Sequence, residues 1–396
     1  MPFEGWNRLP AALQSVLSVL LTWPPKMTAV INSTEKSKMI IQVPPKLFSR
    51  AAFGALGLTM AMSLSAVITP VRAAENISIG VSIPTLDNPF WVRAVDFAKH
   101  TSNTLGIELV VVGAENKEEK QLNDVQSLIS RGVKALVVTP QSTATAPGLI
   151  RLANRSNLPI MIVDRYPGFP AKNDKAPYLA FIGPDDVTAG RDIANFLISN
   201  GAKKLVGIGG LPGSSVAEGR QKGLNEAIAG ATAKGVELVQ YVGAGESEDK
   251  GYSTMQNLLA AHPSGAIDAV WCYNDALAVG AYRAVQQAGR SKDIIIGGMD
   301  LTPEALNLIE KKTNFVYSTG GHWLQVGFGV MIAYDAIHGH PPIEDDIRLS
   351  LIGVDSQNFA KFKQEYIDNP PPFDVKKYML TFTPTTKRQT FPLQVQ

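Results

Sequence analysis

The sequence predicts an α/β protein of two similar lobes, each a doubly wound parallel sheet, joined by a three-crossing hinge. Short apolar runs rich in β-branched residues alternate with helical patterns from residue 77 onward, which is typical of βαβ units. The alternation starts again near residue 188, and there are more units than one doubly wound sheet usually holds. The length of 396 residues also agrees with more than one domain.

The composition is that of an ordinary globular protein and excludes several classes of function. Hydrophobic residues make up 45% of the chain and charged residues 18%. A net charge of +2 gives no reason to expect nucleic acid as a partner. Cys272 is the one cysteine, so no intrachain disulfide can form, and the five scattered histidines do not suggest a metal site. We therefore expect neither a metal nor a cofactor.

Residues 1–73 are interpreted as an N-terminal extension followed by a secretory signal. Arg50 precedes an apolar run over 51–68, and the residues from Val71 to Ala73 form a small-residue cleavage site. A membrane anchor is the alternative, because the run is close to the shortest length that spans a bilayer. No cysteine follows the run closely, which excludes a bacterial lipoprotein anchor. A signal cleaved after Ala73 predicts a periplasmic protein.

The first lobe is predicted over residues 74–183 and 320–348. Five apolar runs are expected to form its strands: Ile77–Ile83, Glu108–Val112, Ala135–Thr139, Ile160–Val163 and Tyr178–Ile182. Helical patterns cover Trp91–Leu105, Lys117–Arg131 and Pro147–Asn154. A last helix over Trp323–His338 ends at Gly339, as a helix C-cap does.

The second lobe is predicted over residues 184–319 and 349–396. Its strands are expected near Lys204–Gly209, Glu237–Val242, Ala269–Tyr273, Ile294–Gly298 and Phe315–Thr319. Its helices are expected over Thr188–Ser199, Val216–Ala229, Gly251–Ala261, Ala276–Ala288 and Thr302–Lys311. The hinge crossings are placed near Ile182–Asp185, Ser318–Gly321 and Arg348–Leu351. The tail from Asn369 on is rich in Pro and Lys and is expected to wrap a lobe surface.

The stretch Leu86–Trp91 lies where the first strand ends and the first helix begins, which is where open α/β sheets place ligand-binding residues. Asn88 offers an amide that donates and accepts hydrogen bonds at once, as a sugar hydroxyl does. Phe90 and Trp91 offer flat apolar rings that suit the C–H faces of a sugar. The structural alternative makes Asn88 a helix N-cap, held out of the α region by Pro89, with two aromatic residues in the core.

Polar and charged residues follow the other strands at the same edge of each predicted sheet. A carboxylate accepts hydrogen bonds from two neighbouring hydroxyls and an arginine fork donates two, which fits a neutral polyhydroxylated ligand. Structural alternatives remain, since Asp164 can pair with Arg165, and Asp275 or Asp300 can cap the helix that follows. For Asp275 we favour the cap. The candidate ligand contacts are Asn88, Phe90, Trp91, Thr139, Asp164, Arg165, Arg220, Glu246, Asn274 and Asp300.

A series of short motifs keeps a specific order and spacing along the chain. They are Asp87-Asn88-Pro89-Phe90-Trp91, Val163-Asp164-Arg165, Ile182-Gly183-Pro184-Asp185-Asp186 with Ala189-Gly190-Arg191, Arg220-Gln221-Lys222-Gly223, Met255-Gln256-Asn257-Leu258-Leu259, Asn274-Asp275 and Gly298-Met299-Asp300. With these motifs the chain resembles, over residues 76 to 355, the periplasmic sugar-binding proteins of ABC transporters, in the ribose-binding protein group.

The resemblance implies a type I periplasmic binding protein fold and a monomer without enzymatic activity. Such a protein captures a monosaccharide or polyol between its lobes and delivers it to the membrane permease of an ABC importer. The resemblance also implies sugar contacts for eight residues: Asn88, Phe90, Trp91, Asp164, Arg165, Arg220, Asn274 and Asp300.

Three other functions are weighed against import. A receptor that presents the ligand to a chemoreceptor or sensor kinase would have the same sequence features. A regulator of the lactose-repressor type shares the fold but needs a helix-turn-helix where the signal stands, and none is readable there. A secreted sugar-modifying enzyme needs two carboxylates poised across one bond, and nothing in the sequence indicates such a pair.

Three positions depart from the ribose-binding pattern. Thr139 stands where that protein has an asparagine, Glu246 where it has an aromatic residue, and Gly321 where a hinge glutamine would reach the sugar. These departures favour a ligand larger than a pentose or richer in hydrogen-bond donors, such as a hexose or a longer polyol. Because an unpaired buried glutamate is costly, we expect the ligand or a lysine to meet Glu246.

Overall fold

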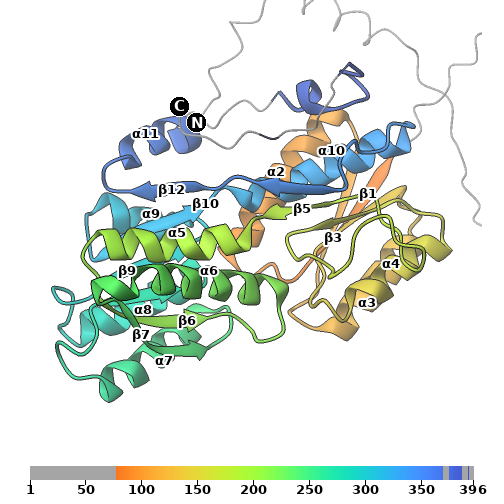
Figure 1. The fold of residues 1–396 in the computed structure, drawn as a ribbon. Coiled ribbons are helices and arrows are strands. Elements are labelled where there is room, and N and C mark those ends of the chain that lie inside the picture. The colour runs from red at the N-terminus through yellow and green to blue at the C-terminus, as the bar shows by residue number, and fades with distance from the viewer. Residues whose placement is uncertain (1–76, 369–373, 386–390, 392–396) are drawn as a thin grey trace, which may run out of the picture. The chain divides into compact units, whose positions relative to one another are not determined.

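The computed structural model describes residues 77–368, 374–385 and 391, so the predicted extension and signal over residues 1–73 lie outside the described chain. The described residues form two six-stranded sheets with helices on both faces (Figure 1). Every pair of neighbouring strands is parallel except one. The predicted fold class, two α/β lobes built on parallel sheets, is confirmed.

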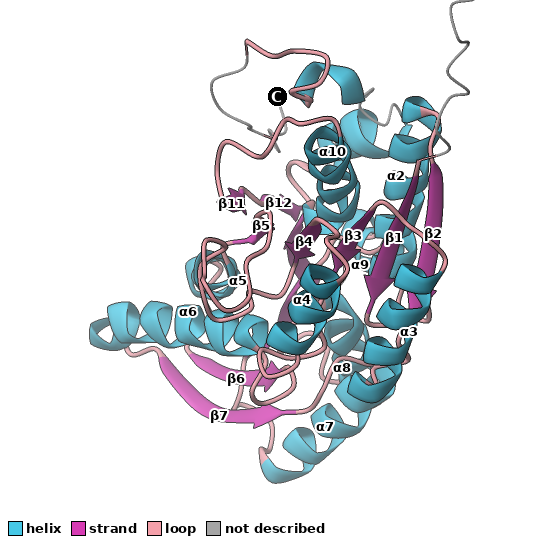
Figure 2. Cartoon of the chain, turned by 90° about the vertical axis from the view of Figure 1, so that its right-hand side faces the viewer, coloured by secondary structure: helices cyan, strands magenta, loops and turns pink. Residues whose placement is uncertain are grey.

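The first lobe holds six strands and four helices. The strands are β1 (Ser78–Ile83), β2 (Glu108–Gly113), β3 (Ala135–Val138), β4 (Ile160–Val163), β5 (Phe181–Pro184) and β11 (Asp346–Leu349). The helices are α2 (Pro89–Leu105), α3 (Glu118–Ser130), α4 (Ala146–Arg155) and α10 (Gln325–Ile337). The strand order is β11-β5-β4-β3-β1-β2. Helices α2 and α10 pack together on one face of this sheet, and α3 and α4 pack on the other (Figure 2).

The second lobe repeats this plan. Its strands are β6 (Lys204–Gly209), β7 (Glu237–Gly243), β8 (Ala269–Cys272), β9 (Ile295–Met299), β10 (Phe315–Gly320) and β12 (Ile352–Asp355). Its helices are α5 (Asp186–Ser199), α6 (Ser215–Ala231), α7 (Glu248–Ala261), α8 (Asp275–Gln287) and α9 (Pro303–Glu310). The strand order is β12-β10-β9-β8-β6-β7, and β12 pairs antiparallel with β10. Helix α5 packs closely on α6, as α7 does on α8.

The chain passes between the two sheets at three places. The first is between β5 and α5, the second between β10 and the 3-10 helix η2 (His322–Leu324), and the third between β11 and β12. Strand β5 begins later than its apolar run suggested. The Tyr178 hydroxyl donates to the Phe169 carbonyl and the Tyr178 N–H to the Ala171 carbonyl, so this residue belongs to the preceding loop.

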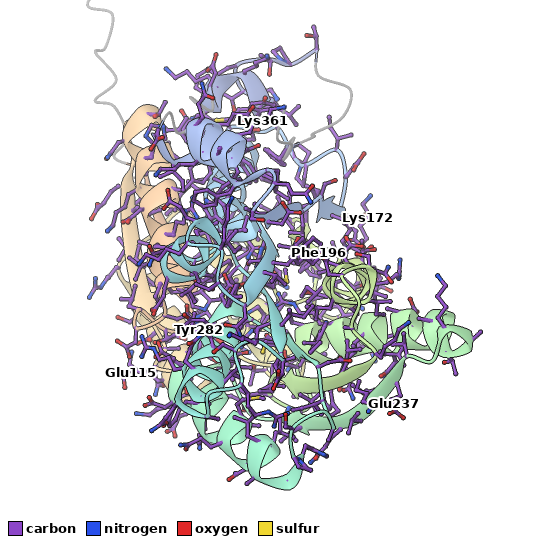
Figure 3. The ribbon with its side chains drawn as sticks, turned by 90° about the vertical axis from the view of Figure 1, so that its left-hand side faces the viewer. Glu115, Lys172, Phe196, Glu237, Tyr282 and Lys361 are labelled. Carbon is purple, nitrogen blue, oxygen red and sulfur yellow. The ribbon has the colours of Figure 1, made fainter. Side chains whose placement is uncertain are left out.

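The strands are buried because helices cover both faces of each sheet. Every residue of the central strands β3, β4 and β8 is buried, whereas the edge strands β2 and β7 stay partly exposed. Charged side chains such as Glu115, Lys172 and Glu237 point outward (Figure 3). Within the described chain, no helix combines the length and apolar character needed to cross a bilayer. Because charged side chains are rarely buried in proteins, those that are buried here indicate an unusual local environment.

Two glycines allow α5 and α6 to touch backbone to backbone. A Cβ on Gly190 of α5 would lie 2.0 Å from the backbone oxygen of Arg220, and a Cβ on Gly223 of α6 would lie 2.0 Å from the backbone oxygen of Val187. No side chain fits at these distances. The contact holds the backbone of Arg220, a predicted ligand contact, against its neighbouring helix.

The C-terminal tail contacts both lobes. Helix α11 (Phe359–Lys363) packs on α9 and β12 of the second lobe, where Lys363 pairs with Glu310. Farther along, the N–H groups of Leu380 and Thr381 and the Thr381 hydroxyl donate to the buried Asp335 carboxylate on α10, at 2.6–2.9 Å. The expected division placed the whole tail, within 349–396, in the second lobe. Within this tail, residues 380–381 contact a helix of the first lobe.

Candidate ligand-binding site

A small cavity between the lobes gathers most of the predicted ligand contacts. The residues that line it are Asn88, Phe90, Trp91, Asp164, Arg165, Arg220, Glu246, Tyr273, Asn274, Asp300 and His322. The cavity volume is about 30 Å³, enough for one or two water molecules. A sugar can therefore enter only if the lobes or the lining side chains move apart.

Thr139 is the one predicted contact that does not line the cavity. Its side chain is fully buried and its hydroxyl has no hydrogen-bond partner. Its backbone continues the strand pairing, since its N–H donates to Ser82 and its carbonyl accepts from the Gln121 side chain. The structure thus places Thr139 in the packing of the sheet, outside the lining of the cavity.

Asn88 has the capping role that the structural alternative gave it, and it also lines the cavity. Its side-chain oxygen accepts a hydrogen bond of 2.9 Å from the Phe90 N–H, and Pro89 occupies the first helical position. The Phe90 and Trp91 rings meet edge to face with centroids 4.9 Å apart. The Phe90 ring lies 4.5 Å from the His322 ring. Asn88 can therefore cap α2 and line the cavity at the same time.

Asp164 and Asp300 occupy equivalent positions, directly after β4 and β9, the fourth strands of the two lobes in chain order. Both adopt positive φ, at 67° and 125°, a conformation that is uncommon for residues other than glycine. Both side chains are buried. The Gln325 amide donates to Asp164 at 2.6 Å, and the His322 Nε2 atom lies 3.5 Å from Asp300. One carboxyl group from each lobe, each on a residue of positive φ, thus lines the cavity.

Arg165 connects the lobes. Its Nη1 donates to the Gln141 carbonyl at 2.7 Å within the first lobe, and its Nη2 meets both carboxylate oxygens of Glu246, in the second lobe, at 3.2 Å. The Tyr273 hydroxyl also donates to Glu246. We expected the ligand or a lysine to meet Glu246; in the described chain an arginine and a tyrosine meet it instead of a lysine, and the expected ligand contact stays a prediction.

Arg220 is held on three sides. Its Nε donates to Asp186 at 3.0 Å, its Nη1 donates to the Tyr273 carbonyl at 2.9 Å, and its guanidinium carbon lies 4.6 Å from the Tyr273 ring centroid. Only 3% of the residue surface is exposed. The remaining N–H groups of this fixed fork can serve a ligand in the cavity.

The helix cap predicted for Asp275 belongs to its neighbour. Asn274 caps α8, since its side-chain oxygen accepts from the Leu277 N–H at 2.9 Å. The Asp275 carboxylate accepts instead from the Thr302 N–H and the Ser318 hydroxyl, both at 2.8 Å. Thr302, not Asp300, caps α9. Asn274 also lines the cavity, so it combines capping with a place at the site.

Burial changes the ionisation of the lining groups. It raises the pKa of Asp164, an effect that Arg165 and the Gln325 hydrogen bond partly oppose. It raises the pKa of Asp300 well above its usual value, while Arg220 acts in the opposite direction. Burial, together with the nearby Arg220, lowers the pKa of His322 well below 6.5, so this imidazole is neutral at pH 7. Cys272 is buried, and desolvation raises its thiol pKa, which agrees with an inert thiol.

A periplasmic binding protein domain matches residues 79–341 of the chain. The chain belongs to the periplasmic binding protein family. Among the relatives of this periplasmic binding protein, the ribose import binding protein of Escherichia coli (strain K12) is 32% identical over 249 residues, which cover 62% of this chain and 80% of that protein. The galactofuranose-binding protein of the same organism is 26% identical over 253 residues, covering 62% and 78%.

Solved structures agree with this assignment. A Caulobacter myo-inositol binding protein, determined with myo-inositol bound, matches with a TM-score of 0.66 and 26% identity, over 73% of this chain and 96% of that chain. The type I periplasmic binding protein fold is thereby confirmed, as is the resemblance to sugar-binding proteins of ABC importers. The relatives are binding proteins rather than enzymes, and they are periplasmic.

Four residues at or next to the cavity of this periplasmic binding protein were not among the predicted contacts. Tyr273 directly precedes Asn274 at the end of β8, so its position after a strand was a usable signal. His322 follows Gly321, whose φ of 107° starts η2 and turns the imidazole into the cavity. Gln325 and Asp186 act through Asp164 and Arg220, and nothing in the sequence indicated these partners.

A second cavity of about 760 Å³ lies between α2, α9 and α11, and is lined mostly by apolar surface. Of its lining residues none is among the predicted contacts; the acidic ones, such as Asp96 and Glu310, are exposed, and the half-buried Arg93 already donates to the Leu301 carbonyl and lies over the Trp323 ring. It lacks the convergent buried polar groups that orient a small ligand. The smaller cavity between the strand ends is therefore the candidate ligand-binding site.

Proposed function

We propose that this periplasmic binding protein captures a monosaccharide or related polyol between its lobes and delivers it to the membrane permease of an ABC importer. One observation carries the proposal: carboxylates, guanidinium groups and aromatic rings from both lobes converge on one cavity. Carboxylates and arginine forks each hold two hydroxyl groups, and the rings suit the apolar faces of a sugar. A ligand that contacts both lobes favours the closed form.

The proposal includes export and the absence of enzymatic activity. The periplasmic relatives support export, and cleavage after Ala73 would leave a mature chain that begins at Ala74. Mass spectrometry of a periplasmic fraction should detect that mature chain as a monomer. A membrane-held species that retains residues 51–68 would contradict the cleaved signal.

The ligand is proposed to be a hexose, a hexose derivative or a longer polyol rather than D-ribose. Gly321 contributes no side chain where a hinge glutamine would reach ribose, and the His322 imidazole lines the cavity beside it. Glu246 adds a carboxylate to the wall where an aromatic face would lie. Gly321 leaves room for a larger ligand, and Glu246 adds a hydrogen-bond acceptor for a ligand with more hydroxyl groups.

A thermal-shift screen of the purified protein against pentoses, hexoses and cyclic or linear polyols tests the proposal, followed by calorimetry on each hit. We expect at least one hexose or polyol to bind and the Asp300→Ala variant to lose most of that affinity. If D-ribose binds tightest, near micromolar or better (about −8 kcal/mol), the ligand assignment is wrong. If no member of the panel shifts the melting temperature, the sugar-binding proposal fails.

A further inference from the structure

Carboxyl groups outnumber basic groups among the ionisable side chains at and next to the cavity. Arg165 faces two carboxylates, since its Nη2 meets Glu246 at 3.2 Å and its Nε lies 3.9 Å from Asp164. Arg220 bonds to Asp186 at 3.0 Å. Asp300 contributes a fourth carboxyl group. Two guanidinium groups are thus set against four carboxyl groups, all of them at least four-fifths buried at the side chain.

No other lining group adds a positive charge to the two guanidinium groups. His322 is the nearest basic neighbour of Asp300, at 3.5 Å, but burial and the adjacent Arg220 lower its pKa well below 6.5. Among the described residues that line the cavity there is no lysine. The carboxyl groups also oppose one another, since Asp164 and Glu246 both raise the pKa of Asp300.

Two buried polar atoms at the same place lack a hydrogen-bond partner. They are Nε of Arg165 and Nδ1 of His322, and both residues line the cavity. A buried polar atom without a partner is costly unless a ligand or water satisfies it. These atoms suit hydroxyl oxygens of a polyol, while the surplus carboxyl groups suit a donor that also carries positive charge.

Building on the proposed function, we infer that the ligand is an aminated sugar or aminated polyol, whose ammonium group binds among Glu246, Asp164 and Asp300. An ammonium group brings three donors and one positive charge, so it meets two needs of this site at once. A neutral sugar would leave the carboxyl groups to compete for two guanidinium groups, or would require that they bind protons. Glu246 is the specificity-determining residue, because it adds the charge that an aromatic residue would not.

Matched ligand pairs test this inference. Calorimetry at pH 7 compares D-glucosamine with D-glucose, D-galactosamine with D-galactose, and an inosamine with its parent inositol. The N-acetylated hexosamines serve as third members that keep the nitrogen and lose the charge. In the pair that fits the cavity, we expect the amine to bind about 10- to 150-fold more tightly than its hydroxyl parent, as a charge-assisted hydrogen bond provides. The N-acetyl derivative should not share this advantage.

A variant that removes the charge of Glu246 tests whether this residue causes the preference for the amine. Glu246→Gln keeps the size of the side chain and an acceptor for Arg165, and it should reduce the amine-to-parent affinity ratio at least tenfold. Glu237→Gln, on the outer surface of the same lobe (Figure 3), is the matched control and should keep the wild-type ratio. Circular dichroism melts check that both variants fold.

The outcomes separate the inference from the proposed function. If the hydroxyl parents bind as tightly as the amines or more tightly in every pair, the inference is overturned and the sugar-binding proposal stands. If Glu246→Gln keeps the full amine preference, the role of Glu246 is refuted. If neither members of the pairs nor other sugars bind, both proposals fall together.

Discussion

At the scale of single residues, the two arginines and the two strained aspartates set the chemistry of the cavity. Asp164→Ala, Arg165→Ala, Arg220→Ala and Asp300→Ala should each weaken ligand binding about 10- to 150-fold, because each removes a buried hydrogen-bond partner and leaves the group opposite it unsatisfied, a loss of roughly 1.5–3 kcal/mol. Isothermal calorimetry with the best ligand measures the change. Arg151→Ala, an exposed arginine on α4, is the control and should bind normally. Wild-type affinity in all four site variants would refute the site.

Asp300 should make the stability of the ligand-free protein depend on pH. Its folded-state pKa lies well above 3.8, so the folded protein holds this proton where the unfolded chain has lost it. The resulting contribution is fully present below about pH 4 and is lost as the pH rises through the raised pKa. Denaturant unfolding from about pH 4 to 7 should therefore show a steeper fall in wild type than in Asp300→Asn. Parallel curves would contradict a raised pKa at this residue.

The sequence predicted residues that the structure brings together at one cavity where chemistry and position coincide. Asn88, Arg165 and Asp300 are polar residues that lie between an apolar strand and the next helix, and strand ends of one sheet meet at one edge. Thr139 follows β3 in the same way, yet its side chain is buried in the sheet packing. Successive side chains near a strand end point to different sides, and the sequence does not state which one faces the cavity.

At the scale of elements, the alternation of apolar runs and helical periods located the long helices and most of the strands. Strands β4 and β6 have the predicted bounds. Strands β11 and β12 were not predicted as strands, because each has four residues and they follow a turn rich in Pro and Asp. Their pairing is set by contacts with distant strands, which local sequence does not reveal.

The contact between α5 and α6 gives a prediction at this scale. Gly223→Ala places a methyl group 2.0 Å from the Val187 carbonyl oxygen, so the helices must separate. We expect a loss of about 1–3 kcal/mol in the free energy of unfolding and weaker ligand binding, because Arg220 moves with α6. Chemical denaturation and calorimetry measure the two effects.

Gly230→Ala on the same helix is the matched control. A Cβ at Gly230 meets nothing within 4 Å, and the residue is exposed. Alanine there should leave stability unchanged or raise it by up to about 1 kcal/mol. Equal losses in both variants would show that the close approach of the helices does not explain the effect.

At the scale of the whole molecule, ligand binding should change the separation of the lobes. The lining residues come from both lobes and enclose only about 30 Å³, so the protein must open to admit a sugar and then close around it. Small-angle scattering should show a smaller radius of gyration at saturating ligand than without ligand. An identical radius under both conditions would argue against closure.

The tail adds a constraint that the three hinge crossings do not include. Described residues of the tail contact α9 through Lys363 and α10 through Asp335, so the tail touches both lobes in addition to the three crossings. Such a link acts like a tether that limits how far and how often the lobes part. We expect the tether to slow ligand association and dissociation without changing the affinity, because the cleft between tethered lobes opens less readily. Asp335→Asn weakens the anchor of the tail on α10. Stopped-flow fluorescence should therefore show faster association and faster dissociation of the ligand, with a similar ratio of the two rate constants. Unchanged rates would mean that the tail does not restrain ligand exchange.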